Sequence, residues 1–190
     1  MATDSPADRA PSPADVVRPL VQTRQYRAFT DEPVSSGQLD AIADAGRWSG
    51  SSQNRQPWRF IVIRDRSTIR AIAAAGLPQT RGLQSAPAAI AVVMPDDESR
   101  RISHAYDEGR ASERMLIAAS MLGLGAGVSW LKGDGRRVAA ERLRLPPDRL
   151  IRTIVQVGHP TAEAREPKAA PGAGRRPREE TVFEGVWQAS

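Results

Sequence analysis

Short, nearly continuous apolar runs that alternate with segments of helical spacing are the feature that most constrains this fold. The runs cover residues 58–63, 88–94 and 150–157, and prolines and glycines flank them. Apolar runs of this length are typical of buried β-strands. A chain that alternates such strands with helices forms an α/β or α+β layer structure, so a helical bundle and an all-β sandwich are excluded.

Helical periodicity predicts helices at 15–22, 67–75, 104–122 and 136–143, and one that Ser35 or Ser36 caps and that continues through Gly46. The second half of 104–122 is apolar on almost every face, which predicts a central helix that is covered all round. Asp107 and Glu108 are expected near its start, where carboxylates favour the helix dipole. Glycines at 123, 125 and 127 then lead into a short strand through Val128 and Trp130.

The two ends of the chain differ in composition from its middle. The 190 residues suit one domain, and the boundaries predicted are a disordered segment 1–14, a folded domain 15–160 and a C-terminal arm 161–190. The arm is rich in Pro, Ala, Gly and Arg, but residues 181–187 regain β-forming character. We therefore expect the arm to dock, and both the arm and the long apolar helix indicate a homodimer.

Composition excludes several classes of protein. The chain has no cysteine, which rules out disulfides and thiolate sites, and it has no apolar run near the ~20 residues that span a bilayer. A cytoplasmic location is the expectation that follows. The net charge of +5 comes mainly from arginines. These arginines either form a solvated surface or attract an anionic partner such as nucleic acid. His104 and His159 are too isolated for a metal site, and none is predicted.

Two polar constellations are candidates for chemistry. Arg24 and Arg27 lie close together outside any helix, and their planar guanidinium groups suit a phosphate dianion. The alternative is a surface pair that binds Asp31 and Glu32. The second constellation is the loop 49–57, where hydroxyls and amides gather between a helix and a strand. It suits a planar heterocycle, although an ordinary loop has the same composition.

Three pieces of the sequence together resemble the nitroreductase family of FMN enzymes, over roughly residues 20–187. They are TRQYRAF at 23–29, RWSGSSQNRQPWRFIVI at 47–63, and AYDEGRASERMLIAASMLGLGAG at 105–127 followed by the strand that ends in VGHP. The block N-x-Q-P-W before a strand is the specific part, and the glycine-rich part is weak alone. Thr23 and Gln25 depart from the arginine and serine that are usual in the family.

The resemblance implies an α+β fold, a central and mainly antiparallel sheet flanked by helices, in a homodimer that holds FMN between its subunits. It assigns the phosphate and ribityl chain to Arg24, Gln25 and Arg27, with backbone contacts from Tyr26. Arg175 and Arg176 would complete the phosphate site. Ser51, Ser52 and Asn54 would contact the ring or ribityl hydroxyls, the two serines from the partner subunit. Ser129, Trp130 and Leu131 would lie at the reactive edge. Gln79 and Arg81 fall near further flavin contacts.

The function implied is hydride transfer from NADH or NADPH through FMN to a nitroaromatic, a quinone or an activated alkene. The flavin N5 carries this chemistry, so no catalytic side chain is expected. One pocket shared by donor and acceptor predicts ping-pong kinetics. Relatives that dehalogenate or cleave flavin leave another reaction open. The short segment 94–104 leaves open a flavin store with little turnover. The basic surface leaves open nucleic-acid binding.

Overall fold

A single antiparallel sheet organises the molecule in the computed structural model, which describes residues 11–167 and 174–187. The described strands are β1 (Arg59–Ile63), β2 (Ala88–Pro95), β3 (Gly125–Trp130) and β4 (Arg149–Gly158), in the order β1-β2-β4-β3. The central strands β2 and β4 are buried over most of their length, as continuous apolar runs require. The strands predicted between residues 58 and 157 are confirmed, and the fold is α+β with an antiparallel sheet.

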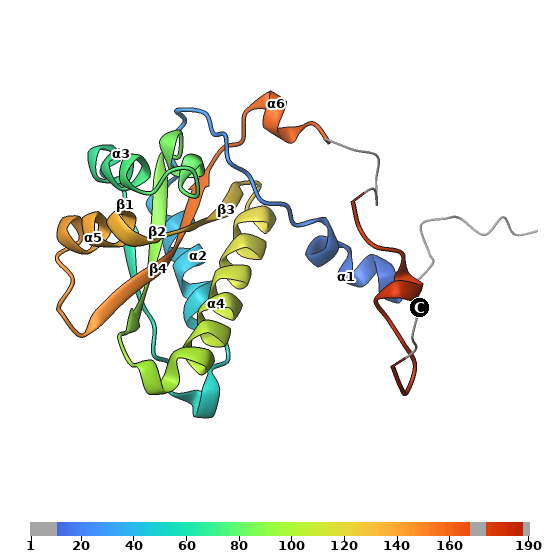
Figure 1. Cartoon of the computed structure of the whole chain (residues 1–190). Coiled ribbons are helices and arrows are strands. Elements are labelled where there is room, and N and C mark those ends of the chain that lie inside the picture. The colour runs from blue at the N-terminus through green and yellow to red at the C-terminus, as the bar shows by residue number, and fades with distance from the viewer. Residues whose placement is uncertain (1–10, 168–173, 188–190) are drawn as a thin grey trace, which may run out of the picture.

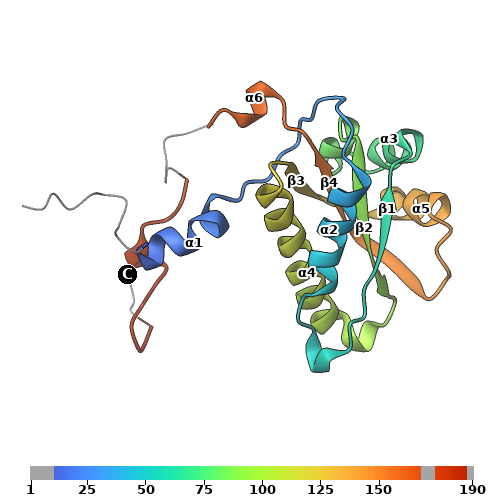
Figure 2. The same cartoon turned by 180° about the vertical axis from the view of Figure 1, so that it is seen from behind.

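Helices cover both faces of the sheet (Figures 1 and 2). The helices α2 (Ser36–Arg47) and α4 (Arg101–Met121) pack on one face, and α3 (Arg66–Ala75) and α5 (Gly133–Arg142) on the other. Each pair closes a separate core. Leu39, Ile42 and Met115 are fully buried in the first, and Ile69, Ile72 and Ile154 are almost fully buried in the second.

Local capping fixes where these helices begin. Ser35, one of the two serines predicted, caps α2, and Gln38 closes the capping box. The helix α4 begins at Arg101, three residues before its predicted start. Asp107 and Glu108 therefore lie a turn and a half inside the helix and are buried with specific partners. Their interpretation as dipole-stabilising carboxylates was wrong.

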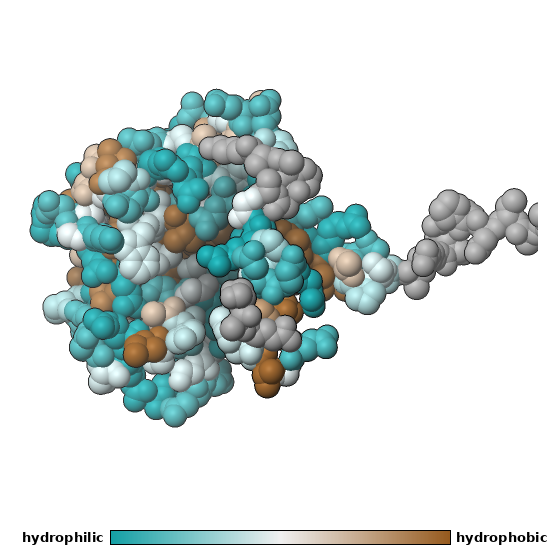
Figure 3. Space-filling model, turned by 45° about the vertical axis from the view of Figure 1, so that its right-hand side comes forward, coloured by the Kyte–Doolittle hydropathy of each residue, from teal (hydrophilic) through white to brown (hydrophobic). Residues whose placement is uncertain are grey.

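Two parts of the chain lie outside this body, at the right in Figure 1. The helix α1 (Pro13–Gln22) has no buried residue. It begins inside the segment predicted to be disordered, of which residues 1–10 lie outside the described residues. Its apolar side chains Val16, Val17, Leu20 and Val21 are exposed, and hydrophobic groups are visible on this projecting side in Figure 3.

The C-terminal arm contributes the short helices α6 (Ala162–Arg165) and η5 (Arg178–Glu180). The prediction of β structure at 181–187 was wrong: these residues form turns, in which the rings of Phe183 and Trp187 lie 5.0 Å apart. A strand needs a neighbour for its backbone hydrogen bonds, and this segment has none within the described chain.

The long helix is also less covered than predicted. Met121 is 75% exposed and Leu122 is 41% exposed. In a single chain, the apolar end of α4 is thus open on one side.

No helix among the described residues is both long enough and apolar enough to cross a bilayer.

Candidate functional site

The segment after α1 extends along the free edge of β3. Gln25 forms a parallel bridge with Ala126, and the Tyr26 N–H donates to the Ala126 carbonyl oxygen at 2.8 Å. The Gln25 side-chain Oε1 accepts a hydrogen bond from the Val128 N–H at 3.1 Å. Gly127 permits this approach, because a Cβ there would lie 2.5 Å from the Tyr26 carbonyl oxygen. The backbone of residues 25 and 26 is therefore held by the sheet.

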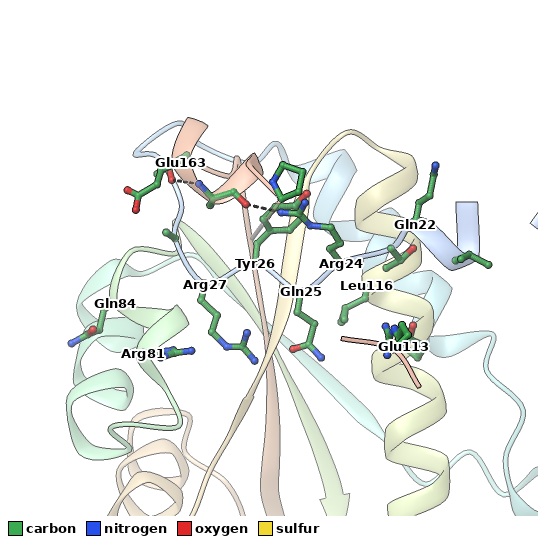
Figure 4. Close-up of a pocket in the computed structure, with 17 residues that line it drawn as sticks. Gln22, Arg24, Gln25, Tyr26, Arg27, Arg81, Gln84, Glu113, Leu116 and Glu163 are labelled. Carbon is green, nitrogen blue, oxygen red and sulfur yellow. Dashed lines mark hydrogen bonds between the residues drawn. The ribbon is translucent and has the colours of Figure 1, made fainter. Parts of the chain in front are cut away.

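An open pocket of about 1320 Å³ lies against this segment (Figure 4). Residues 21–28, η3 (Arg81–Gln84), α4 and the C-terminal arm all contribute to its wall. Its charged lining residues are Arg24, Arg27, Arg81, Arg175, Glu113 and Glu163. Arg24, Gln25, Tyr26, Arg27 and Arg175 were all predicted at the site, and the fold does bring them together.

The arginines of the pocket differ in how they are held. Arg24 donates to the carbonyl oxygens of Ala164 at 2.8 Å and Arg165 at 3.3 Å, and its guanidinium lies over the Tyr26 ring at 5.1 Å. Arg27 and Arg81 are exposed, and their side chains make no hydrogen bond or ion pair to any described residue. Figure 4 shows both reaching into the same space from different segments. Arg27 and Arg81, together with the exposed Arg175, are thus the pocket arginines whose side chains have no partner among the described residues.

The charge of the pocket fits a phosphate monoester. Its four guanidinium groups exceed its two carboxylates by two positive charges. A phosphate monoester carries about −1.5 to −2 at neutral pH and accepts the bidentate hydrogen bonds that guanidinium groups donate. Among the residues that the structure describes, no group of His, Cys, Asp and Glu could hold a metal ion.

The predicted serine and asparagine loop lies at the other end of α4. The buried carboxylate of Asp107 accepts the Ser52 N–H at 3.0 Å, and the Ser51 hydroxyl accepts the Gln56 N–H at 2.9 Å. Gln53, Asn54 and Gln56 all have positive φ values near 50°. Such strained backbone persists only where surrounding contacts hold it, and it is frequent at ligand sites. Ser52 and Asn54 are exposed on this loop.

A single chain does not bring the loop and the arginines together. The pocket contacts α4 at Glu113 and Leu116, whereas the loop contacts it at Asp107. At 1.5 Å of rise per residue, these contacts are about 9–14 Å apart along the helix. A ligand that binds both regions within one chain would have to extend along α4 by at least this distance.

The predicted residues at the end of β3 are only partly available. Ser129 is fully buried and donates to Gln156 Oε1 at 2.8 Å, and Leu131 is fully buried in the α3/α5 core. These side chains are closed to a ligand because they point into the body. Trp130, on the opposite face of the strand, is 44% exposed. Arg176 does not line the pocket. Its Nη1 lies 3.9 Å from Glu180 Oε2 in an exposed ion pair.

Sequence reasoning missed some members of this region. Arg81 was placed near the flavin only by an imprecise match and proves to line the pocket, whereas Gln79 does not. Gln156, fully buried behind the pocket wall, was not singled out. A signal for it was present, since a glutamine between Val155 and Val157 interrupts an apolar strand.

The sequence model of the nitroreductase family matches residues 20–83 of this chain. A Methanothermobacter thermautotrophicus protein, provisionally named NADH dehydrogenase/NAD(P)H nitroreductase, is 32% identical over 155 residues, which are 78% of this chain and 79% of that protein. This identity and coverage decide the relationship. The chain belongs to the nitroreductase family.

Further relatives agree with this assignment. The FMN reductase [NAD(P)H] of Bacillus subtilis is 29% identical over 177 residues, which are 81% of this chain and 70% of that protein. Among solved structures, a provisionally named nitroreductase of Desulfovibrio desulfuricans in complex with FMN has a TM-score of 0.73 and 30% identity. That match covers 94% of this chain and 100% of the other.

Proposed function

We propose that this chain transfers hydride from NAD(P)H through FMN to a small organic acceptor, a nitroaromatic, a quinone or an activated alkene, with ping-pong kinetics. The class itself follows from family membership: the chain is an NAD(P)H-dependent flavin oxidoreductase whose cofactor is FMN. The acceptor, the kinetic order and the site residues are the proposal.

The pocket of four arginines is the observation that carries the proposed site. Arg27 and Arg81 would bind the phosphate of FMN, because they reach into one space and have no described partner. Arg175 would close the site from the C-terminal arm. Arg24 would hold that arm in place through the carbonyl oxygens of Ala164 and Arg165. Gln25 and Tyr26 would position the segment, since their backbone and amide groups are bonded to β3.

A homodimer would complete the site. The exposed apolar side chains of α1, the open end of α4 and the C-terminal arm leave a surface for a second copy to cover. The exposed Ser52 and Asn54 of the partner subunit would then lie against the flavin ring. Trp130 is the side chain at the end of β3 that remains open to the reactive edge.

Bound FMN supplies hydride acceptance and donation at its N5 atom. The protein's contribution is to fix the phosphate and the ring and to leave one face open for donor and acceptor in turn. If donor and acceptor share the pocket that holds the flavin, the order is ping-pong, because the oxidised nicotinamide has to leave before the acceptor enters.

A flavin store with little turnover is a second candidate, favoured by one observation. Between β2 and α4 the chain has only residues 96–100, which hold the short helix η4 (Glu98–Arg100) and no lid over the pocket. Anaerobic mixing of the purified yellow protein with NADH or NADPH separates the two. The proposed oxidoreductase bleaches rapidly and recolours with an acceptor, whereas a store stays yellow.

The phosphate assignment is tested by Arg24→Ala combined with Arg27→Ala. We expect a folded but largely colourless protein, because both the anion-binding charge and the anchor of the arm are lost. The matched control is Arg137→Ala with Arg142→Ala on the exposed face of α5, which should keep the full flavin load. A full load in the Arg24/Arg27 variant would show that the assignment is wrong.

A further inference from the structure

A buried glutamine connects the two sides of the proposed phosphate pocket. Gln156 lies in β4 on the face covered by α3 and α5, and it is fully buried. Its Nε2 donates to the Tyr26 carbonyl oxygen at 3.3 Å, and its Oε1 accepts from the Ser129 hydroxyl at 2.8 Å. Because a backbone carbonyl only accepts, the amide nitrogen has to be the atom that faces Tyr26. The orientation of the amide is thereby fixed.

Two glycines make room for this amide. A Cβ at Gly127 would lie 2.6 Å from Nε2, and a Cβ at Gly82 would overlap the same atom. Nε2 is therefore in close contact with three backbone segments: the Tyr26–Arg27 peptide, β3 and η3. Two of these segments carry the arginines that face the pocket, since Arg27 directly follows Tyr26 and Arg81 directly precedes Gly82.

The η3 segment is also held from its other side. Arg70 donates to the carbonyl oxygens of Leu83 and Ala86, the second at 3.0 Å. The Thr80 hydroxyl donates to the Ala73 carbonyl oxygen at 2.6 Å. The helix α3 thus limits movement of η3 away from the sheet, and the glutamine amide limits its movement toward residue 26.

We propose that Gln156 is a positioning residue that sets the separation of Arg27 and Arg81. Two guanidinium groups that face one space repel each other, so the spacing that suits a phosphate has to be imposed by the backbone beneath them. A buried amide does this because its hydrogen bonds are directional, whereas an apolar side chain would fill the volume without fixing the Tyr26 peptide. The proposal rests on the FMN function proposed above.

The test is Gln156→Met in the full-length protein, with FMN titrated into the apoprotein and followed by quenching of flavin fluorescence. Methionine keeps the length of glutamine but removes both hydrogen bonds. We expect the FMN dissociation constant to rise about tenfold, the effect of losing one to two buried hydrogen bonds. We also expect a changed visible circular dichroism of the bound flavin. Thr153→Val removes another buried hydroxyl from β4 and should change neither quantity.

A double-mutant cycle separates positioning from general stability. If Gln156 acts by positioning Arg27, Gln156→Met should weaken FMN binding little further once Arg27→Ala is present. Full additivity would overturn the proposal, as would an unchanged dissociation constant in Gln156→Met. Should Gln156→Met not fold, Ser129→Ala removes one of the two bonds and should weaken binding by about threefold. An unchanged affinity in that variant would also overturn the proposal.

The wild-type titration distinguishes this failure from failure of the proposed function. A wild-type apoprotein that does not bind FMN would refute the function and the role of Gln156 together. A wild type that binds FMN, with a Gln156→Met variant that binds it equally well, would refute only the role of Gln156.

Discussion

The sheet body and the two terminal segments differ in how far they bury their apolar side chains. In the body, α2 and α4 bury their apolar residues on one face of the sheet and α3 and α5 bury theirs on the other. In α1 no residue is buried, and Val182, Val186 and Trp187 of the C-terminal arm are exposed. The body therefore buries most of its apolar side chains within one chain, except at the end of α4, whereas the terminal segments leave theirs exposed.

The helix α1 shows this dependence most clearly. Its N-terminus is well formed locally, because Ser12 and Asp15 make a reciprocal capping box. A helix of 10 residues is nevertheless marginal in water without tertiary packing. Its stability thus depends on covering the apolar side that the single chain leaves open.

The largest effect is expected inside the body, at the buried ion pair of α4 and β4. Arg152 donates to Glu108 from Nε at 3.0 Å and from Nη2 at 2.9 Å, and the two side chains are only 12% and 5% exposed. Glu108→Gln should lower the free energy of unfolding by about 3 kcal/mol, because it leaves a buried guanidinium uncompensated. Chemical denaturation measures this. Asp134→Asn, which breaks the exposed pair with Arg137, should cost no more than about 0.5 kcal/mol. If both substitutions lowered the free energy of unfolding equally, the buried ion pair would contribute no more to stability than the exposed one.

The next effect concerns α1 and should leave the body intact. Val21→Asp should raise the dissociation constant of the homodimer about a hundredfold, because the dimer carries the substitution twice and each valine loses roughly 1.5 kcal/mol of apolar burial. Sedimentation over a range of concentrations measures the shift, and far-ultraviolet circular dichroism checks the body. Arg142→Asp, on α5 at the far side of the body, is the control and should leave association unchanged. Unaltered association in the valine variant would show that α1 is not at the interface.

Subunits with complementary defects test whether the arginines and the loop of one FMN site come from different chains. One subunit carries Arg24→Ala and Arg27→Ala, and the other carries Ser52→Ala and Asn54→Ala. Each homodimer should bind FMN poorly. A heterodimer isolated with two affinity tags should recover about half of the wild-type flavin load, because one of its two sites takes intact arginines and an intact loop from different chains. Absence of recovery would place each site within one subunit.

The smallest effect is expected at the N-cap of α3. Hydrogen bonds from Thr68 and then from Ser67 hold the pKa of Asp65 well below its usual 3.8. A carboxyl whose pKa is depressed on folding stabilises the fold above its unfolded pKa and loses that contribution as the pH falls. Asp65→Ala should therefore lower the melting temperature slightly at pH 7. The difference from wild type should shrink below about pH 4. A difference that does not depend on pH would exclude the charge as its cause.

Much of the body could be predicted from the sequence. Ser35 and the spacing of Leu39 and Ile42 determine α2, and the continuous apolar run at 88–94 determines a central strand. The grouping of Arg24, Gln25, Tyr26 and Arg27 also followed from local pattern and resemblance. The β character of 181–187 was predicted wrongly, because pairing of a strand depends on a distant neighbour.

Local sequence determined where the elements lie, since periodicity, caps and breakers act over a few residues. Only the tertiary structure decided that Leu131 and Ser129 point into the body, that Arg81 joins Arg27 at one pocket and that Gln156 lies between them. It also placed the loop of Ser51, Ser52 and Asn54 at the other end of α4. The physical reason is that these relations depend on which segments pack together, and packing joins residues that are far apart along the chain.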